Sequence, residues 1–138
     1  MSSFARSLKT TAPPEKVWSI WSDVSTWSQW NPDVVSMQLD GAFATGTAGT
    51  MTTKSGGAHA VVLGQVQPGS YFTVETDPVP LTHFTFHCRV NPSNGGSEIS
   101  QEVTMSGPLA FFFRAMAGNR VAGDFPALLE GLKSLAEG

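Results

Sequence analysis

The sequence has few of the features that mark exported, membrane-spanning or nucleic-acid-binding proteins. Its one cysteine, Cys88, cannot form a disulfide within the chain, and a lone thiol is typical of a reducing cytoplasm. Apolar runs stay well below the roughly 20 residues that a membrane-spanning helix needs. The first residues, Met1 to Arg6, lack the apolar core of an export signal. We therefore expect a cytoplasmic protein without a membrane span.

Charged residues are also scarce, at 14% of the chain, and acidic ones outnumber basic ones, which gives a net charge of −3 at pH 7. Proteins that bind nucleic acid normally present a basic face, so no nucleic-acid partner is expected. The hydrophobic content of 41% is typical of a globular chain rather than a disordered one. A length of 138 residues predicts one domain over 1–138 with a substantial core.

The C-terminal tail carries the clearest periodic pattern. The stretch from Gly107 to Glu137 is predicted as one long helix, because apolar residues recur at spacings of four and three. Gly118, Gly123 and Pro126 weaken its middle, since Gly costs about 1 kcal/mol in a helix and Pro removes a backbone donor. We expect the apolar face of this helix to be buried against the strands that precede it. From residue 121 onward, that face comprises Val121, Phe125, Leu128, Leu132 and Leu135.

The segments before the tail predict two short helices and several strands. One helix opens at Pro13-Pro14-Glu15, and a second short one runs from Trp27 to Trp30 and stops at Asn31-Pro32. Gly and Pro clusters at 54–57, 68–69, 77–80 and 91–96 mark turns or breaks between strands. The predicted class is α+β, with a curved antiparallel sheet closing around the tail helix. The predicted strands are Phe4–Thr10, Val34–Leu39, Thr47–Thr53, His59–Gln67, Tyr71–Thr76, Leu81–Val90 and Glu98–Ser106.

Alternation along the last two strands predicts which side chains face the helix. Phe84, Phe86, Cys88 and Val90 share one side of their strand. In the next strand Ile99, Val103 and Met105 share a side with Gln101. The apolar sides must face the helix, so Gln101 is an amide among hydrophobic side chains and needs a hydrogen-bond partner.

Four segments resemble a known family. They are Ala12–Trp18 (APPEKVW), Trp27–Val34 (WSQWNPDV), Gly95–Ile99 (GGSEI) and Ser106–Leu109 (SGPL). Together and in this order they resemble the polyketide cyclase/dehydrase group of the START-like (SRPBCC, Bet v 1-like) superfamily. The resemblance implies the helix-grip fold, in which a seven-stranded antiparallel sheet wraps around a long C-terminal helix with a deep cavity between them. Its members include lipid binders, cyclases and hydrolase-like enzymes, so the fold alone assigns no chemistry.

Metal, nucleophilic and phosphate-binding sites are not predicted. His83 and His87 lie four residues apart on the outer face of a strand, roughly 13 Å apart and too far to share one ion. Cys88 has no neighbouring base in sequence and is interpreted as a small buried hydrophobe. The segment Gly46-Thr47-Ala48-Gly49 lacks the strand–helix context of a phosphate loop, and no cofactor is expected.

His59 is the candidate for proton transfer inside the cavity. Alternation places it on the side of Val61, Leu63 and Gln65, which the resemblance orients inward. The other interpretation, which we favour, is that His59 caps the hairpin beside Gly56-Gly57 in solvent. Arg120 follows the weak point in the tail helix and either points at the cavity mouth or is exposed.

Aromatic and methionine side chains make the stronger functional pattern. Trp21 fits the buried face of the first helix and Trp18 lies off it, whereas Trp27 and Trp30 are placed nearer the cavity entrance. With several Met residues they predict an adaptable apolar pocket for a flat or greasy molecule. The predicted ligand-binding residues are Trp27, Trp30, Met37, Met51, His59, Val61, Phe84, Phe86, Gln101, Val103, Phe113, Met116 and Arg120.

The leading functional hypothesis is a protein that binds a small hydrophobic, polyketide-like or lipid-like ligand between sheet and helix, with Gln101 orienting it. A second hypothesis is a cyclase or dehydrase that uses the same cavity, in which one polar side chain moves a proton. The third is a partner-binding module without a ligand, using the loop from Asp40 to Gly46 and exposed aromatics. The oligomeric state is left open between monomer and homodimer.

Overall fold

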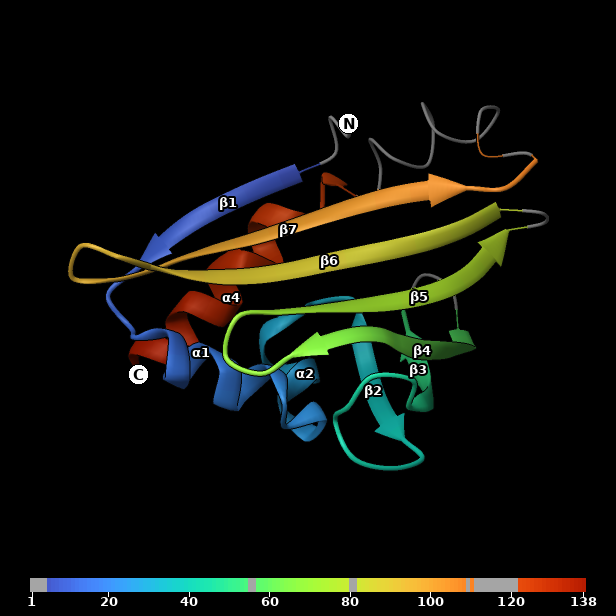
Figure 1. Cartoon of the computed structure of the whole chain (residues 1–138), viewed down its shortest axis with the longest axis horizontal. Coiled ribbons are helices and arrows are strands. Elements are labelled where there is room, and N and C mark those ends of the chain that lie inside the picture. The colour runs from blue at the N-terminus through green and yellow to red at the C-terminus, as the bar shows by residue number, and fades with distance from the viewer. Residues whose placement is uncertain (1–4, 55–56, 80–81, 109, 111–121) are drawn as a thin grey trace.

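The computed structural model describes residues 5–54, 57–79, 82–108, 110 and 122–138. Within these residues, the elements with printed bounds are seven strands, three helices and one short 3-10 turn (Figure 1). In chain order they are β1 (Ala5–Thr10), α1 (Pro14–Trp21), η1 (Val24–Thr26), α2 (Trp27–Trp30), β2 (Val34–Leu39), β3 (Ala48–Thr53), β4 (Gly57–Gln67), β5 (Tyr71–Val79), β6 (Thr82–Ser93), β7 (Gly96–Ser106) and α4 (Phe125–Glu137).

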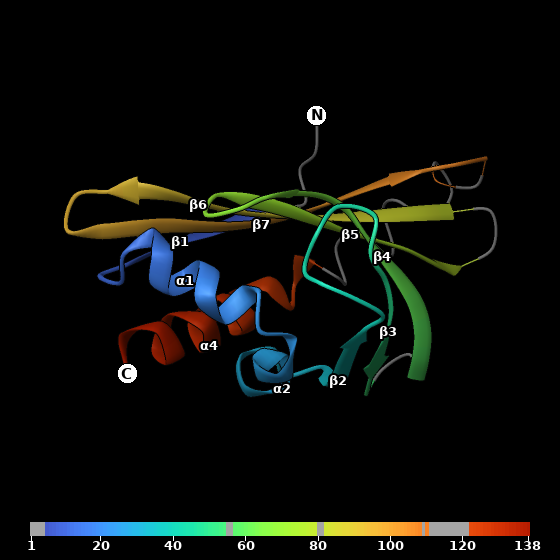
Figure 2. The same cartoon turned by 60° about the horizontal axis from the view of Figure 1, so that its bottom comes forward.

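All seven strands join in one antiparallel sheet with the order β1-β7-β6-β5-β4-β3-β2. Helices α1, α2 and α4 lie against one face of this sheet, and the β2–β3 end of the sheet bends toward α2 (Figure 2). The predicted α+β class and the helix-grip arrangement are therefore confirmed. We call the side of the sheet that faces the helices its inner face.

Irregular positions in the ladder decide which residues of β4 point inward. Val61 and Leu63 lie on the inner face and are buried, as predicted. The register between β4 and β5 then shifts, so that Val66 rather than Gln65 pairs with Phe72 of the inner face. Gln65 is exposed, and the expectation that it faces inward is wrong. An extra residue in one strand reverses the alternation beyond it, which a pattern of apolar residues alone does not reveal.

Two predicted chain breaks are instead parts of strands. β5 continues through Asp77 and Pro78 to Val79, with a register shift after Thr76. β6 continues through Asn91, Pro92 and Ser93, and only Asn94-Gly95 forms the turn to β7. Gly95 has a φ of 76°, and Asn-Gly is a preferred two-residue hairpin turn because both positions then adopt positive φ easily. Proline is tolerated in a strand where its missing N–H is not needed.

Helix α4 begins after a turn at Gly123 and Asp124, where the sequence predicts a weak point. One helix was expected from Gly107 to Glu137, but Gly107 and Pro108 form a bend and a turn, and the turn at residues 123–124 precedes α4. Residues 109 and 111–121 of the expected helix lie outside the described residues. The buried face of α4 includes the predicted Phe125, Leu128 and Leu132, together with two residues that the periodic pattern had not selected, Leu129 and Ala136. Leu135, which had been selected, is half-buried. Of the helices that the structure describes, none has the combination of length and apolar sequence needed to cross a bilayer.

The end of α4 is attached to the junction between β1 and α1. Glu137 Oε2 accepts hydrogen bonds from Thr10 Oγ1 at 2.6 Å and from the Thr11 backbone N–H at 3.1 Å. Lys133 Nζ donates to Glu137 Oε1 at 3.2 Å. These donors favour the carboxylate, and they lower the pKa of Glu137 from 4.5 to about 2.

Substituting Glu137 tests this attachment. In Glu137→Gln we expect a lower melting temperature at neutral pH, because the amide replaces a charged acceptor of three hydrogen bonds. Since the folded pKa is depressed, the stabilisation is present above pH 4.5 and is lost as pH falls toward about 2. Thermal unfolding from pH 7 to pH 2 checks this. Glu130→Gln, on the exposed side of the same helix, is the control, and a pH-independent gap between wild type and Glu137→Gln would contradict the prediction.

Gly131 allows α4 to approach α2. A Cβ at this position would collide with the backbone carbonyl oxygen of Trp30, which cannot move without shifting α2. Overpacking of this kind costs about 1–3 kcal/mol, against about 1 kcal/mol that alanine gains over glycine in a helix. We therefore expect the collision with α2 to cost more free energy than alanine gains over glycine in helix propensity.

In Gly131→Ala we expect the free energy of unfolding to fall by up to about 2 kcal/mol, measured by urea denaturation. Ser134→Ala is the matched control, because Ser134 is exposed on the same helix and should change stability by less than about 0.5 kcal/mol. A Gly131→Ala variant that is more stable than the wild type would show that the two helices do not pack this closely.

Candidate functional site

The inner face of the sheet is built from rows of side chains that adjoin one another across neighbouring strands. One row joins Phe72 of β5 to Cys88 of β6 and Gln101 of β7. A second row joins Leu63, Val74, Phe86 and Val103 across β4 to β7. The alternation predicted for the last hairpin is thus confirmed. Strand pairing also places Phe72 and Gln101 in the same row, although they are far apart in the sequence.

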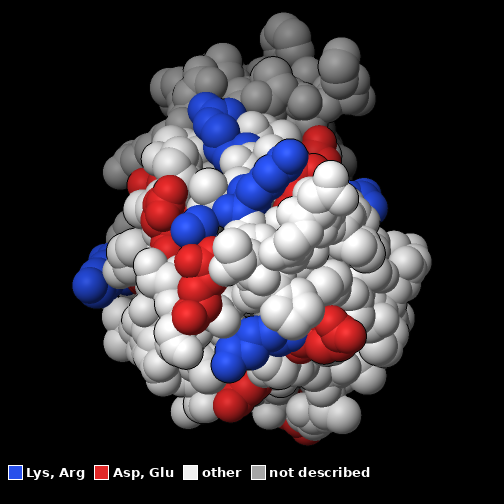
Figure 3. All heavy atoms as spheres, turned by 90° about the vertical axis from the view of Figure 1, so that its left-hand side faces the viewer, with Lys and Arg blue, Asp and Glu red and all other residues white. Residues whose placement is uncertain are grey.

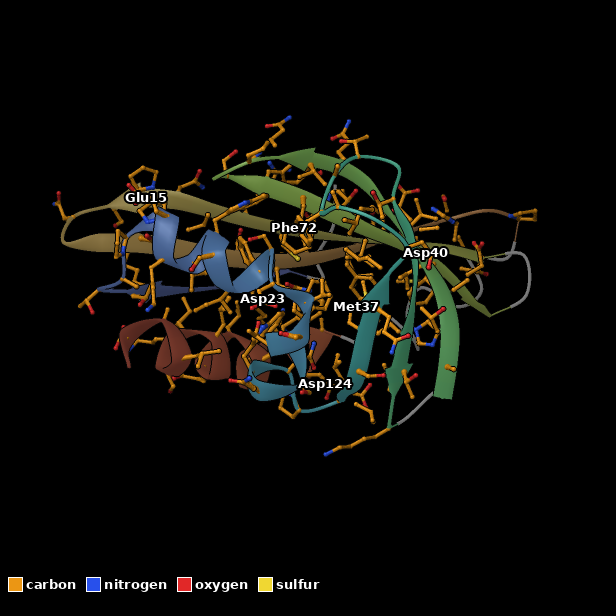
Figure 4. All side chains as sticks on the ribbon, turned by 90° about the horizontal axis from the view of Figure 1, so that it is seen from below. Glu15, Asp23, Met37, Asp40, Phe72 and Asp124 are labelled. Carbon is orange, nitrogen blue, oxygen red and sulfur yellow. The ribbon has the colours of Figure 1, made fainter. Side chains whose placement is uncertain are left out.

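A third row crosses the bent end of the sheet. Met37 of β2 pairs with Met51 of β3, which pairs with His59 of β4. Figure 4 shows Met37 and Phe72 pointing into the space between the sheet and the helices. Met37 is buried, whereas Met51 and His59 are half-buried. By register His59 lies on the inner face, opposite Met51. Its Nδ1 also lies 3.2 Å from the carbonyl oxygen of Gly57, at the end of the hairpin. Each of the two interpretations of His59 is therefore met in part.

Gln101 has a polar partner on the inner face. The Sγ of Cys88 donates a hydrogen bond to Gln101 Oε1 at 3.1 Å. Burial raises the pKa of the Cys88 thiol far above its ordinary range, and the bond to Gln101 offsets that only in part. Cys88 is therefore a neutral thiol and a hydrogen-bond donor. The Gln101 amide, on a residue only 8% exposed, is left with its NH₂ group for another acceptor.

Coverage of the inner face is uneven. Phe72, Leu63 and Val103 are fully buried. Phe86, Met105 and Met51 also point inward but are only half-buried. Apolar side chains that face the interior and still meet solvent mark an apolar surface that the described part of the chain leaves partly uncovered.

Phe72 and five other aromatic residues pack together, and we call these six residues the aromatic cluster. The ring centroid of Phe72 lies 5.2 Å from that of Trp21, 5.9 Å from Trp18 and 6.0 Å from Trp27. Phe43, in the loop between β2 and β3, lies 5.1 Å from Phe72, and Trp30 lies 5.5 Å from Trp27. Most of these pairs are edge-to-face or tilted, the arrangements that aromatic quadrupoles favour. Phe72 is not among the residues that the sequence predicts for the site, although it follows the Pro68-Gly69 turn and alternates with Val74.

The indole N–H groups of this cluster are not all satisfied. Trp27 Nε1 donates to the backbone oxygen of Trp21 at 2.9 Å. Trp21 Nε1 and Trp30 Nε1 are buried, and nothing in the described part of the chain accepts a hydrogen bond from either. Trp27 and Trp30 are 4% and 3% exposed, so they lie in the core rather than at an exposed entrance, where the sequence had placed them.

Most predicted ligand-binding residues lie on or beside the inner face. Val61, Phe84, Phe86, Gln101 and Val103 project from the sheet, and Trp27 and Trp30 approach it from α2. Phe113, Met116 and Arg120 lie outside the described residues. The structure thus brings together residues of β2 to β7 and α2.

Sequence comparison adds a family assignment to this geometry. A family model described as polyketide cyclase/dehydrase and lipid transport matches residues 1–137. The chain belongs to the polyketide cyclase/dehydrase and lipid transport family. The resemblance read from four short segments is therefore confirmed. No curated protein matches the chain in sequence at a significant level.

Solved structures share the fold of this family member at low sequence identity. CV1439 from Chromobacterium violaceum superposes with a TM-score of 0.72 and 17% identity over 97% of this chain and 96% of its own. The di-domain ARO/CYC protein BexL, from the BE-7585A biosynthetic pathway, has a TM-score of 0.74 and 18% identity over 97% of this chain and 49% of BexL. Ara h 8.0201 has a TM-score of 0.65 and 17% identity over 94% and 96%. At these identities the likeness shows the fold alone.

The outer face of the sheet of this family member carries two histidines in hydrogen-bonded networks. His83 Nδ1 lies 2.8 Å from Asp77 Oδ1, and its Nε2 lies 2.9 Å from Glu75 Oε1. Carboxylates only accept, so the two ring nitrogens can both donate to them only when the ring is protonated. The bonds to Asp77 and Glu75 raise the pKa of His83 above 6.5.

His87 lies on the same face in a different environment. Its Nδ1 lies 2.8 Å from Tyr71 Oη and its Nε2 lies 3.0 Å from Thr104 Oγ1. Arg89 stacks over the Tyr71 ring at 4.2 Å. Burial lowers the pKa of His87 below 6.5, and Glu102 counteracts this only in part. Within the described residues no group of three or more His, Cys, Asp or Glu side chains is placed to hold a metal ion.

Charges on the surface are mixed in sign. On the end of the molecule shown in Figure 3, Lys and Arg side chains alternate with Asp and Glu. Such a mixed surface sets up no strong field of one sign at that end.

The pKa values of the two histidines should be shifted from 6.5 in opposite directions. For His83 the folded pKa is raised, so its stabilisation is present below pH 6.5 and is lost as pH rises through the folded pKa. For His87 the folded pKa is lowered, so its stabilisation is present above pH 6.5 and is lost as pH falls through the folded pKa. Following the ring C–H signals by NMR from pH 4 to pH 9 measures the two pKa values and checks the direction of each shift. Titration of His83 below His87 would contradict the assignment of these networks.

Proposed function

We propose that the protein binds a small hydrophobic, polyketide-like or lipid-like molecule between the inner face of the sheet and the C-terminal helix. The observation that carries the proposal is the half-burial of Phe86, Met105 and Met51, which point inward from three different strands. A ligand that covers these side chains gains about 25 cal/mol for each Å² of apolar surface removed from water. The family description, which combines polyketide cyclisation with lipid transport, supports the same class of ligand.

Gln101 supplies directionality to this apolar site. Its Oε1 accepts from Cys88, which fixes the orientation of the amide and directs its NH₂ group away from that bond. An amide held in this way can donate to a ligand oxygen. We propose that Gln101 orients the ligand, while the surrounding side chains recognise its shape. The buried, reduced Cys88 is compatible with action in the cytoplasm.

A cyclase or dehydrase is the second candidate, favoured by the family description and by the fold shared with the ARO/CYC protein BexL. Proton transfer needs a group that titrates near neutral pH and faces the substrate. Among the described inner-face residues, His59 and Cys88 are the candidates, and the thiol of Cys88 is held neutral by burial. His59 would have to act as a lone acid or base, so we rank catalysis below binding.

A ligand-free partner-binding module has less support. It was expected to use the loop Asp40 to Gly46 and exposed aromatics, but Phe43 of that loop packs on Trp18 and Phe72. Of the large hydrophobic residues that the structure describes, Val35 and Val62 are the exposed ones, at 52% and 40%. Two exposed valines do not form the extended apolar patch that marks a protein interface.

A charge placed on the inner face tests the binding proposal. We expect wild-type protein to bind the neutral apolar dye N-phenylnaphthylamine with enhanced dye fluorescence. Phe86→Asp should weaken binding by at least about tenfold, because the carboxylate would lose water when the dye covers it. Thr85→Asp is the matched control, since it places the same charge on the neighbouring residue but on the outer face. Equal dye affinity in the two variants, or no dye binding by the wild type, would refute the proposal.

Native mass spectrometry of the purified protein, before and after denaturation, identifies a natural ligand. A small molecule that is released on denaturation would supply its own mass. If a Gln101→Leu variant retained such a molecule with unchanged affinity, Gln101 would not orient the ligand, whereas the proposal of apolar binding would stand.

A further inference from the structure

The inner face of the sheet ends at strand β1, and the residue that β1 presents there is basic. Arg6 pairs in register with Gln101 of β7, so the two side chains are neighbours on the same face of the sheet. The row that runs from Phe72 through Cys88 to Gln101 therefore ends in a guanidinium at the edge of the sheet (Figure 1). Because Arg6 is exposed, its charge lies where the inner face meets solvent.

Both members of this pair offer hydrogen-bond donors. The guanidinium of Arg6 has several N–H groups and no acceptor, and its Nη1 donates to the Ala5 carbonyl oxygen at 2.8 Å. Gln101 Oε1 accepts from the Cys88 thiol at 3.1 Å, so the amide presents its NH₂ group. Burial raises the pKa of this thiol, which therefore stays protonated and remains a donor. A ligand group that meets Arg6 and Gln101 together must accept hydrogen bonds.

This donor pair adjoins the half-buried apolar side chains on which the proposed function rests. Phe86 pairs with Val103, two residues from Gln101, so Phe86 and Gln101 are diagonal neighbours about 7–8 Å apart. Met105 lies on the same face of β7, roughly 13 Å from Gln101 along the strand. A molecule that lies over Phe86 and Met105 can thus reach Gln101 and Arg6 with one end.

Arg6 is also the exception in the distribution of charge over the sheet. Register and hydrogen bonds place the other Lys, Arg, Asp and Glu residues of the described strands on the outer face. These residues are Lys9, Glu75, Asp77, Arg89, Glu98 and Glu102. A single positive charge at the edge of an apolar face matches a ligand that has one negative charge and an otherwise apolar body.

We propose that Arg6 and Gln101 bind the carboxylate of a hydrophobic monocarboxylic acid whose apolar part covers Phe86 and Met105. The inference rests on the proposed function, because it assumes that a small apolar molecule occupies the inner face. A carboxylate suits the pair, since it only accepts hydrogen bonds and matches the planar guanidinium in shape and charge. At the exposed edge it keeps part of its hydration, whereas at the centre of the apolar face it would lose its water.

Decanoate and 1-decanol provide a matched test, because they share a hydrocarbon chain and differ in the charge of the head group. Each is titrated against the protein at pH 7 by displacement of N-phenylnaphthylamine. The quantity compared is the Kd of decanol divided by that of decanoate, in which the contribution of the chain nearly cancels. In Arg6→Gln we expect this ratio to fall roughly fivefold, between the effect of an exposed ion pair and that of a buried charge-assisted hydrogen bond. In Gln101→Leu the ratio should also fall, because the NH₂ donor is lost.

Lys9→Gln is the matched control. It removes the same charge from the same strand, but Lys9 is exposed and pairs with Glu98 on the outer face. The ratio should therefore stay within about twofold of the wild-type value. Arg6→Lys keeps the charge and should retain part of the preference for decanoate. Circular dichroism and the melting temperature establish that each variant is folded before its affinities are compared.

Salt tests the same proposal without any substitution. Raising NaCl from about 50 mM to about 500 mM screens charges, so wild-type protein should bind decanoate more weakly and decanol no more weakly. Decanoate binding that does not respond to salt would overturn the proposal. A ratio that is unchanged in Arg6→Gln or in Gln101→Leu, or that falls equally in Lys9→Gln, would also overturn it.

The dye separates this inference from the proposed function on which it rests. Failure of decanoate to displace bound N-phenylnaphthylamine would overturn the role of Arg6 and Gln101 and would leave apolar binding standing. Failure of the dye to bind at all would overturn the proposed function.

Discussion

The packing of Phe72 is the interaction on which the rest of the structure depends. Its side chain enters the interior from β5 and touches aromatic rings from α1, from α2 and from the loop between β2 and β3. The same residue pairs across the sheet with Cys88, which pairs with Gln101. One fully buried ring therefore connects the two N-terminal helices to the middle of the sheet. Aromatic side chains bury the largest areas, so few other residues could hold these segments together as strongly.

Because Phe72 fills one region of the interior, the inner face is divided into two environments. Around the aromatic cluster the side chains are closely packed, and two indole N–H groups have no acceptor among the described residues. Toward Phe86, Met105 and Met51 the apolar surface is only partly covered. Glu137 attaches the end of α4 to Thr10 and Thr11, and Gly131 lets the same helix meet the backbone of Trp30. The helix is thus held at its C-terminal half, near the aromatic cluster.

The sheet also separates apolar recognition from titratable chemistry. The ion-paired and hydrogen-bonded histidines, His83 and His87, lie on its outer face with Glu75, Asp77 and Tyr71. On the inner face the described polar groups include an amide, indoles and a neutral thiol, which do not readily exchange protons at neutral pH, beside one imidazole, that of His59. This arrangement favours binding over proton-transfer catalysis, and it explains why a family that includes both activities does not by itself decide between them.

Local patterns in the sequence determined the order of the elements, the alternation of the last hairpin and the family to which the chain belongs. Those properties depend on neighbours along the chain, so periodicity and short motifs report them. The inward turn of Val66 in place of Gln65, the continuation of β5 and β6 through proline, and the burial of Trp27 and Trp30 depended on register and on distant segments. Only the tertiary structure decided that Cys88 bonds to Gln101 and that Trp27 has an acceptor, whereas Trp21 and Trp30 have none within the described residues. Whether a polar atom is satisfied depends on which residues the fold brings within hydrogen-bond distance, and no spacing along the chain contains that information.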